Sequence, residues 1–225
     1  MSTSASAPAF AKRSETLSGA GPLLAILGVG LAIRLIFLPA SGFHNDLQAF
    51  EAWALTLTEH PLRDFYTSTS FADYPPGYFF VLLAIGWLYK GLVAVHAIAP
   101  DAYNVLGMLA KLPAILMDTV NAWLLFTIVG RFAARPVALG AAMLYAFNPA
   151  AIYISAFWGQ VDSVSWGLVL VAINLLLSAR DDGRSGMAKV ATAWVVLAIS
   201  ILMKPQGTFV GLVFLAFAFV PAGAD

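Results

Sequence analysis

The sequence predicts an all-α, polytopic membrane helix bundle with about six to seven membrane helices. Of the 225 residues, 60% are hydrophobic and 11% are charged, whereas a soluble domain carries roughly a quarter charged residues. Seven apolar stretches also have lengths near the roughly 20 residues that a bilayer-spanning helix needs. These stretches cover residues 20–40, 76–97, 104–130, 137–157, 163–179, 189–203 and 207–221.

The charge balance and the absence of cysteine exclude several classes of function. Twelve basic and twelve acidic residues give no net charge, so no nucleic-acid partner is expected. No cysteine is present, which excludes disulfides, thiolate metal sites and cysteine nucleophiles. The three histidines lie far apart and do not form a metal-binding spacing.

The first element is a polar tail, residues 1–20, which we expect to be disordered and cytoplasmic, followed by a single transmembrane module over 21–225. Lys12 and Arg13 precede the first span. Its apolar run is too long for a signal-peptide core and lacks a clear cleavage site. We therefore interpret it as a retained helix, with its N-terminus in the cytoplasm by the positive-inside rule.

The remaining spans follow from the same rule. Basic clusters at 131–135 and 180–189 are expected to be cytoplasmic, so the loop at about 41–77 and the turns at 158–163 and 204–207 lie outside. A full crossing by 76–97 would break this parity. We interpret that stretch as re-entrant or interfacial; the alternative is that the charge rule does not hold for this chain.

The first external loop contains a predicted amphipathic helix over residues 42–54. Asp46, Phe50 and Trp53 would share one face at i, i+4 and i+7. In one interpretation this is an interfacial helix that Asn45 or Asp46 caps. In the other, Asp46 is a general base held above the membrane plane.

Asp73 directly precedes Tyr74 and two prolines in FADYPPGYF, at the start of an apolar stretch. A proline is tolerated in the first helical turn, and a helix N-terminus favours a negative charge, so Asp73 is either a cap or a functional acid. The loop from Pro61 to Gly77 is long, polar and aromatic, and loops of that length are often functional.

Polar and charged residues also lie within two of the predicted spans. Asn104, Lys111 and Asp118 are spaced by seven and share one helix face. Lys111 and Asp118 either pair within that helix, or Lys111 offers a cation to a phosphate. Arg34 lies deep in the first span and would pair with a phosphate or with another acid.

The turn at 158–163 and the end of the span at 189–203 are the last polar positions. The turn contains Trp158, and its residues Gln160 and Asp162 exceed the turn formers that a plain helical hairpin needs. Lys204 and Gln206 follow the later span, and a snorkelling lysine is the simpler explanation of Lys204. These positions are predicted to lie on the same side of the membrane as Asp46.

Taken together, these segments resemble the polyprenyl-phosphate-sugar-dependent glycosyltransferases of the GT-C superfamily. The nearest resemblance is to bacterial relatives of the GPI mannosyltransferases, and a more distant one is to the endoplasmic-reticulum glucosyltransferases that extend dolichol-linked oligosaccharide. The resemblance covers about residues 20–210. The segments that carry it are, in order, HNDLQAFEAW, DYPPGY, KLPAILMD, NPAAIYISAFWGQVDS and MKPQG.

The resemblance implies an inverting transfer of a sugar, mannose first, from a polyprenyl-phosphate donor to a hydroxyl of a lipid or glycan acceptor. The reaction would occur at the extracytoplasmic face of a bacterial inner membrane. Asp46 would act as the base and Asp73 as a second acid. The implied substrate-binding residues are, for the phosphate and in order of preference, Lys111, Lys204 and Arg34; for the sugar, Gln160, Asp162, Trp53 or Trp158; and Gln206 in MKPQG.

Members of this superfamily often carry two acids in the first loop, whereas HND supplies one. No metal ligands are therefore predicted and no cofactor is required, although a divalent cation is left open. Members are usually longer, so the chain resembles an N-terminal half. Two other functions remain open: a transporter or flippase for a lipid-linked or anionic solute, and a non-catalytic membrane subunit.

Overall fold

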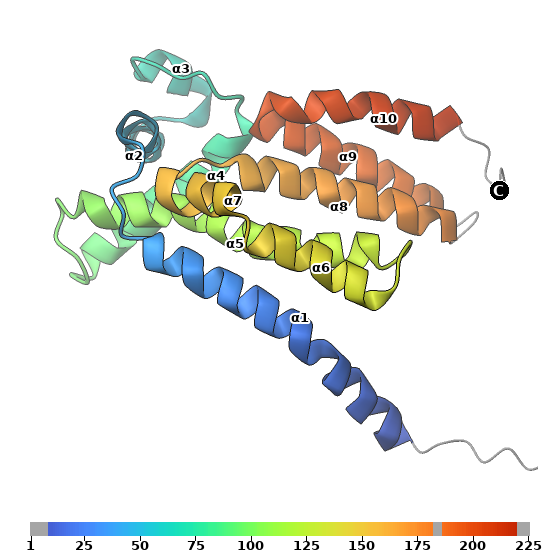
Figure 1. The fold of residues 1–225 in the computed structure, drawn as a ribbon. Helices are drawn as coiled ribbons and strands as arrows, with labels where there is room; N and C mark the ends of the chain where they lie inside the picture. Colours follow the sequence, from blue (N-terminus) through green and yellow to red (C-terminus); the bar gives the residue numbers. More distant parts are fainter. Residues whose placement is uncertain (1–8, 182–185, 220–225) are drawn as a thin grey trace, which may run out of the picture.

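The computed structural model describes residues 9–181 and 186–219, and every regular element within them is a helix, which confirms the predicted fold class (Figure 1). The elements are, in order, α1 (Ala9–Phe37), α2 (His44–Glu59), η1 (Leu62–Asp64), α3 (Phe65–Ser68), α4 (Gly77–Ala94), α5 (Tyr103–Val129), α6 (Arg135–Ala146), α7 (Pro149–Ile152), the π-helix η2 (Tyr153–Trp158), α8 (Asp162–Asp181), α9 (Met187–Met203), η4 (Pro205–Gly207) and α10 (Thr208–Phe219).

Four of the described helices are long and apolar enough to cross a membrane: α1 from Gly19 onward, α4, α5 and α8. The bent pair of α6 and the segment from Pro149 to Trp158 would be a fifth span. Two shorter apolar helical segments, α9 and η4 with α10, bring the apolar helical segments to seven (4 + 1 + 2). Each coincides with one of the seven predicted stretches, and the last two residues of the stretch 207–221 lie outside the described residues.

The predicted disordered tail is wrong for its second half, because the chain is helical from Ala9 onward. Residues 1–8 lie outside the described residues. Once a helix such as α1 has formed, each added residue gains a hydrogen bond without a new nucleation cost. The alanine, lysine, arginine and glutamate residues of this segment are good helix formers, so the helix continues from the apolar span, which begins at Gly19, toward the N-terminus.

The stretch 137–157, predicted as one span, is broken. The chain leaves α6 at Phe147 and bends by 43° before the next helical segment. Asn148 starts that segment as a true N-cap, since its side chain accepts hydrogen bonds from the backbone N–H groups of Ala150 (2.9 Å) and Ala151 (3.4 Å). Pro149 occupies the first helical position, where its missing N–H is not needed.

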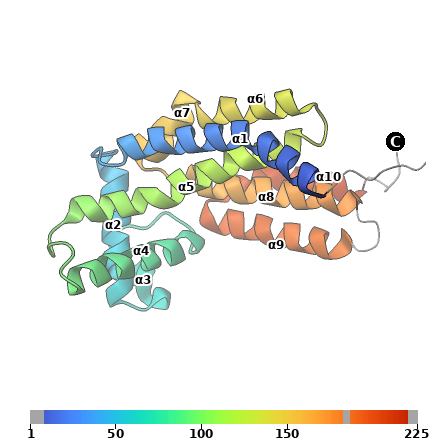
Figure 2. The same cartoon turned by 90° about the horizontal axis from the view of Figure 1, so that it is seen from below.

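The helices form a bundle with a separate layer at one end (Figures 1 and 2). Helices α5, α6, α8, α9 and α10 run along the bundle, and the N-terminal half of α1 diverges from it. Helix α2 crosses this direction at the end of the bundle, where α3 and α4 also lie. This end layer corresponds to the predicted first external loop and to the stretch after it.

Helix α4 meets the length and composition of a span, yet it belongs to the end layer. It starts beside the last turn of α9, where Gly77 lies against the backbone of Leu202 and Met203. From there α4 and the first turns of α5 extend beyond the ends of α1, α8 and α9 (Figures 1 and 2). The interpretation of this stretch as interfacial or re-entrant stays a prediction.

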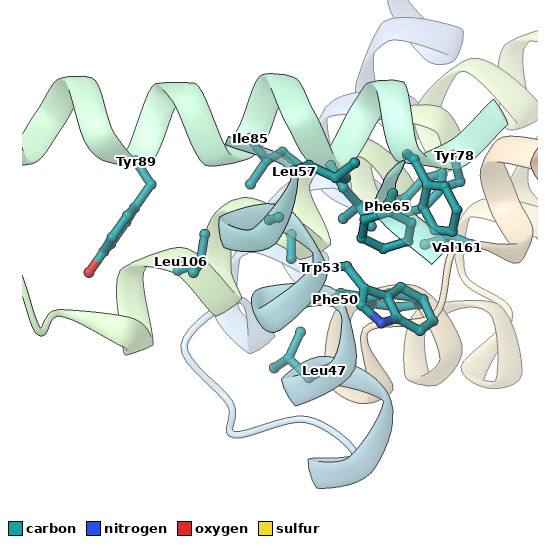
Figure 3. Close-up of a cluster of buried hydrophobic side chains, with 14 of the residues drawn as sticks. Leu47, Phe50, Trp53, Leu57, Phe65, Tyr78, Ile85, Tyr89, Leu106 and Val161 are labelled. Atoms are coloured by element: carbon teal, nitrogen blue, oxygen red, sulfur yellow. The ribbon is translucent and has the colours of Figure 1, made fainter. Parts of the chain in front are cut away.

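An aromatic core holds α2, α3 and α4 together (Figure 3). The rings of Phe50, Trp53, Phe65 and Tyr78 gather at the start of α4, whereas Tyr89 lies further along that helix. Phe50 packs against Trp53 at 5.7 Å between ring centroids and against Tyr78 at 5.8 Å. Buried aromatic pairs of this kind contribute about 0.5–1.5 kcal/mol each beyond their area burial, which fixes the position of α2.

Gly86 is the point where α2 and α4 touch backbone to backbone. A Cβ atom at this position would lie 2.3 Å from the carbonyl oxygen of Ala54. We expect Gly86→Ala to lower the free energy of unfolding by about 1–3 kcal/mol, as overpacking usually does. Gly91→Ala is the matched control in the same helix, since a Cβ there meets nothing within 4 Å. Equal thermal stability of the two variants in detergent would contradict this close crossing.

Candidate functional site

A cavity of about 420 Å³ lies where the end layer meets the bundle. Four segments that are distant in the sequence contribute to it: α2, the loop before α4, the turn after η2, and the residue after α9. Its lining residues are Asn45, Asp46, Ala49, Phe50, Trp53, Phe71, Asp73, Tyr74, Gln160 and Lys204. Five of the residues singled out in the sequence, Asp46, Trp53, Asp73, Gln160 and Lys204, are therefore brought together.

Asp46 is positioned by a sharp turn at Gly42. Gly42 has a φ of +73°, and a Cβ there would lie 2.9 Å from Leu47 and 3.0 Å from the Trp158 carbonyl oxygen. The next residue, Phe43, donates its backbone N–H to that same carbonyl (2.9 Å). Phe43 is also the N-cap of α2 and makes no side-chain capping bond, so the interpretation of Asn45 or Asp46 as the cap is wrong.

One oxygen of the Asp46 carboxylate is held by two donors. Its Oδ2 accepts a hydrogen bond from Trp158 Nε1 (2.8 Å) and another from the side-chain amide of Gln160. Both donors come from the segment that ends η2, where Gly159 turns the chain with a φ of +92°. No hydrogen bond to Oδ1 arises from the described residues, so the carboxylate has a fixed orientation and one oxygen free for a ligand.

Asp73 lies on the cavity wall rather than at a helix end. Helix α4 begins at Gly77, its N-cap is Pro76, and no side chain caps it. The capping interpretation of Asp73 is therefore wrong, because two prolines and Tyr74 separate the aspartate from the first helical N–H groups. The carboxylate is left available to the cavity.

Tyr74 links the two sides of the cavity. Its hydroxyl donates to Gln160 Oε1 at 3.0 Å. Burial raises the pKa of the Tyr74 hydroxyl, and the negative charges of Asp162, Asp73 and Asp46 raise it further. Tyr74 therefore stays protonated and acts as a donor. Sequence reasoning did not single out this residue, although its place next to Asp73 in DYPPGY was a usable signal.

Lys204 is the cation of the cavity. Its Nζ donates to Asp162 Oδ1 (2.5 Å) and to Gln160 Oε1 (3.2 Å), and it lies 5.6 Å from the ring centroid of Tyr74. Asp162 is thus held at the rim as the partner of Lys204.

Three carboxylates and one ammonium give this region a formal charge of −2 (−3 + 1). The three carboxylates are those of Asp46, Asp73 and Asp162, and the ammonium is that of Lys204. Such a balance suits the neutral hydroxyl groups of a sugar, and Lys204 is the cation within it that an anionic group could approach.

Two basic candidates lie outside the cavity. Lys111 is fully buried, and its Nζ donates to the Ala40 carbonyl oxygen at 2.5 Å. Arg34 is also buried, and its Nε donates to Asp118 Oδ2 at 2.7 Å. The interpretation of a Lys111–Asp118 pair is therefore wrong, because the arginine of α1 occupies the carboxylate instead. Of the three predicted phosphate ligands, the fold brings only Lys204 to the cavity.

The remaining candidates take supporting positions. Trp53 is buried, with 3% of its surface exposed, and donates its Nε1 to the Phe71 carbonyl at 2.7 Å. Trp158 packs against the ring of Phe43, with centroids 4.9 Å apart, and reaches the cavity through its bond to Asp46. Gln206 lies outside the lining, and its buried Oε1 has no hydrogen-bond partner among the described residues.

A divalent cation has no evident ligand set in the described part of the chain. No group of three or more histidine, aspartate or glutamate side chains has the proximity to hold one. Asp46 is committed through one oxygen to Trp158 and Gln160, and Asp162 is committed to Lys204.

We compared the chain with protein-family models, with curated proteins and with solved structures, and none of the three comparisons gave a match.

Proposed function

We propose that this protein is a membrane glycosyltransferase that moves a sugar, mannose most readily, from a polyprenyl-phosphate donor to an acceptor hydroxyl. The observation that carries the proposal is the cavity in which Asp46, Asp73, Gln160 and Lys204 meet. Carboxylates and an amide suit the donors and acceptors of sugar hydroxyls. The cavity also lies at the end of an apolar bundle, where a lipid-linked donor has access.

Asp46 is suited to act as the general base. Its Oδ2 is fixed by Trp158 and Gln160, which leaves Oδ1 to accept the proton of an acceptor hydroxyl. The deprotonated oxygen attacks the anomeric carbon, the bond from that carbon to the phosphate oxygen breaks, and polyprenyl phosphate leaves with the electron pair. Attack from the face opposite the phosphate inverts the configuration at the anomeric carbon. Proton abstraction by a positioned base contributes about 10²–10⁴-fold to such reactions.

Lys204 is suited to balance the charge that develops on the leaving phosphate. An ammonium at that point stabilises the transition state more than the ground state. Asp162 and Gln160 hold Nζ in place before the donor binds. Asp73 and Tyr74 would then orient the sugar through its hydroxyls, with the ring of Phe50 or Phe71 below it.

The proposed site faces the extracytoplasmic side. It follows the C-terminal end of α1, whereas Lys12 and Arg13 stand near the N-terminal end of that helix. Arg131 and Arg135 lie at the α5–α6 turn, at the opposite end of the bundle from the end layer (Figure 1). Both sets of basic residues support a cytoplasmic location for that opposite end, and a bacterial inner membrane is the proposed location.

The test is a transfer assay with the purified chain in liposomes. Synthetic mannosyl, glucosyl and arabinosyl polyprenyl phosphates are offered with an inner-membrane lipid extract and with short oligosaccharides as acceptors. We expect stoichiometric release of polyprenyl phosphate and glycosylated acceptor with one donor. Absence of transfer and of donor hydrolysis with all three donors would reject the proposal. Export of the intact donor from the liposomes would support a flippase instead.

Lys204→Met is expected to lower the transfer rate by about 10²-fold, the usual effect of removing one charge-stabilising donor. Lys204→Arg should recover part of that loss because it keeps the charge. Lys90→Met is the control, because Lys90 pairs with Glu59 in α2 and is absent from the cavity lining. An unchanged kcat in Lys204→Met would remove Lys204 from the leaving-group role.

A further inference from the structure

A second polar cavity lies on the other side of α2 from the proposed catalytic site. Its volume is about 260 Å³, and it is bounded by the loop that follows α1, by α2 and by the start of α5. The lining side chains that can form hydrogen bonds are Ser41, His44, Gln48, Glu51, Tyr103 and Asn104. None of these side chains lines the first cavity, which holds Asp46.

We propose that this cavity binds a sugar unit of the acceptor, so that α2 separates an acceptor site from the donor site. The proposal rests on the proposed glycosyltransferase function and adds the class of acceptor, a saccharide rather than a simple lipid alcohol.

The polar side chains of the second cavity are open to a ligand, because most of them are exposed and Glu51 is half-buried. Among the described residues, no hydrogen bond involves the side chains of His44, Gln48, Glu51 or Asn104, in contrast to the interlinked side chains around Asp46. Planar carboxylate, amide and imidazole groups together offer both donors and acceptors. Tyr103, which is 53% exposed, adds an aromatic face against which an apolar sugar face can pack. This combination suits a neutral polyol.

The Glu51 carboxylate is placed by a glycine in α5. A Cβ atom at Gly107 would lie 2.6 Å from Glu51 Oε1, so the carboxylate rests directly on the helix backbone there. Burial raises the pKa of Glu51, and the positive charge of Lys111 beneath it partly offsets that rise. Glu51 thus lines the cavity in a defined position, and its carboxylate accepts no hydrogen bond from the described residues.

The two cavities share the first turn of α2. His44 lines the second cavity, whereas its neighbours Asn45 and Asp46 line the first. Three successive helical residues rise only about 3 Å between the first and the last. A saccharide seated against Glu51 and His44 can therefore extend past this turn and bring a terminal hydroxyl to the free oxygen of Asp46.

Saccharide binding is tested with the full chain in nanodiscs by saturation-transfer NMR. The probes are mannosyl, glucosyl, galactosyl and arabinosyl oligosaccharides of two to four units. We expect one class to bind, and Glu51→Gln to weaken it about tenfold, as loss of one hydrogen bond to a charged group does. Gly107→Ala, which displaces the carboxylate without removing it, should weaken binding similarly. Gly140→Ala in α6 is its control, since a Cβ there meets nothing within 4 Å.

The outcomes separate this inference from the proposed function. Oligosaccharide binding that persists in Asp46→Asn and weakens in both Glu51→Gln and Gly107→Ala supports the second site. In the transfer assay, the same two variants should raise the KM of the acceptor and leave the KM of the donor unchanged. Transfer with unaltered acceptor KM in both variants would overturn the acceptor site and leave the proposed function intact. Failure of all probes to bind the wild-type protein would also overturn it.

Discussion

Replacing Asp46 with asparagine is expected to reduce sugar transfer by about 10²- to 10⁴-fold, the range lost when a positioned general base is removed. The amide has nearly the shape of the carboxylate but cannot take the acceptor proton. Trp158 and Gln160 both donate to Asp46, and an asparagine oxygen can still accept from one of them. The measurement is initial-rate transfer with the best donor in liposomes.

Two controls make the Asp46 result specific. Asp64→Asn changes an exposed carboxylate on η1 that contacts only its exposed neighbour Arg63 among the described residues, and it should transfer at the wild-type rate. Thermal unfolding of Asp46→Asn in detergent should stay within a few degrees of wild type. A folded Asp46→Asn variant that retains wild-type transfer would remove Asp46 from the catalytic role.

Arg34→Met is expected to lower the free energy of unfolding by about 3–5 kcal/mol, the loss seen when one member of a buried ion pair is removed. Arg34 and Asp118 are 2% and 1% exposed. The guanidinium also donates to the carbonyl oxygens of Gly30 (3.0 Å) and Ala146 (2.7 Å), so it joins α1 to α5 and α6. Without it the Asp118 carboxylate is left charged and buried.

The partners of Asp118 define the matching double variant. Tyr145 Oη (2.7 Å) and Ser163 Oγ (2.6 Å) donate to its Oδ1, so α6 and α8 belong to the same network. Arg34→Met combined with Asp118→Leu removes both charges and should regain a large part of the lost stability. Denaturant titration in mixed micelles measures both variants, with the exposed Arg63→Met as control. Equal stability of Arg34→Met and the control would contradict this role.

Much of the fold was predictable because a bilayer imposes simple rules on the sequence. A lipid-exposed backbone must satisfy its own hydrogen bonds, so an apolar run of sufficient length becomes a helix. The break within 137–157 was also visible in principle, since Asn148 and Pro149 form a helix-start signal. It was missed because the apolar run continues on both sides of that dipeptide.

The site was harder to predict, because spacing along a helix does not determine which neighbour a residue meets. Lys111 and Asp118 share a face of α5, yet Asp118 meets Arg34 of α1. Lys204 lines the cavity and Lys111 does not for the same reason: the register between α5 and the end of α9 is a tertiary property. Asp46, Asp73 and Gln160 were grouped by order along the chain, and the fold brings them to one cavity.

The π-helix η2 has a consequence for the evolution and engineering of this protein. An α-helix rotates by about 100° per residue, and a π-helix accommodates one extra residue within a turn. Rewinding Tyr153–Trp158 as an α-helix without changing its number of residues would turn the following side chains by about that angle. Trp158 and Gln160 would then lose their hydrogen bonds to Asp46. The π-helical winding of this apolar segment is therefore as important to the position of Asp46 as the polar residues of the cavity.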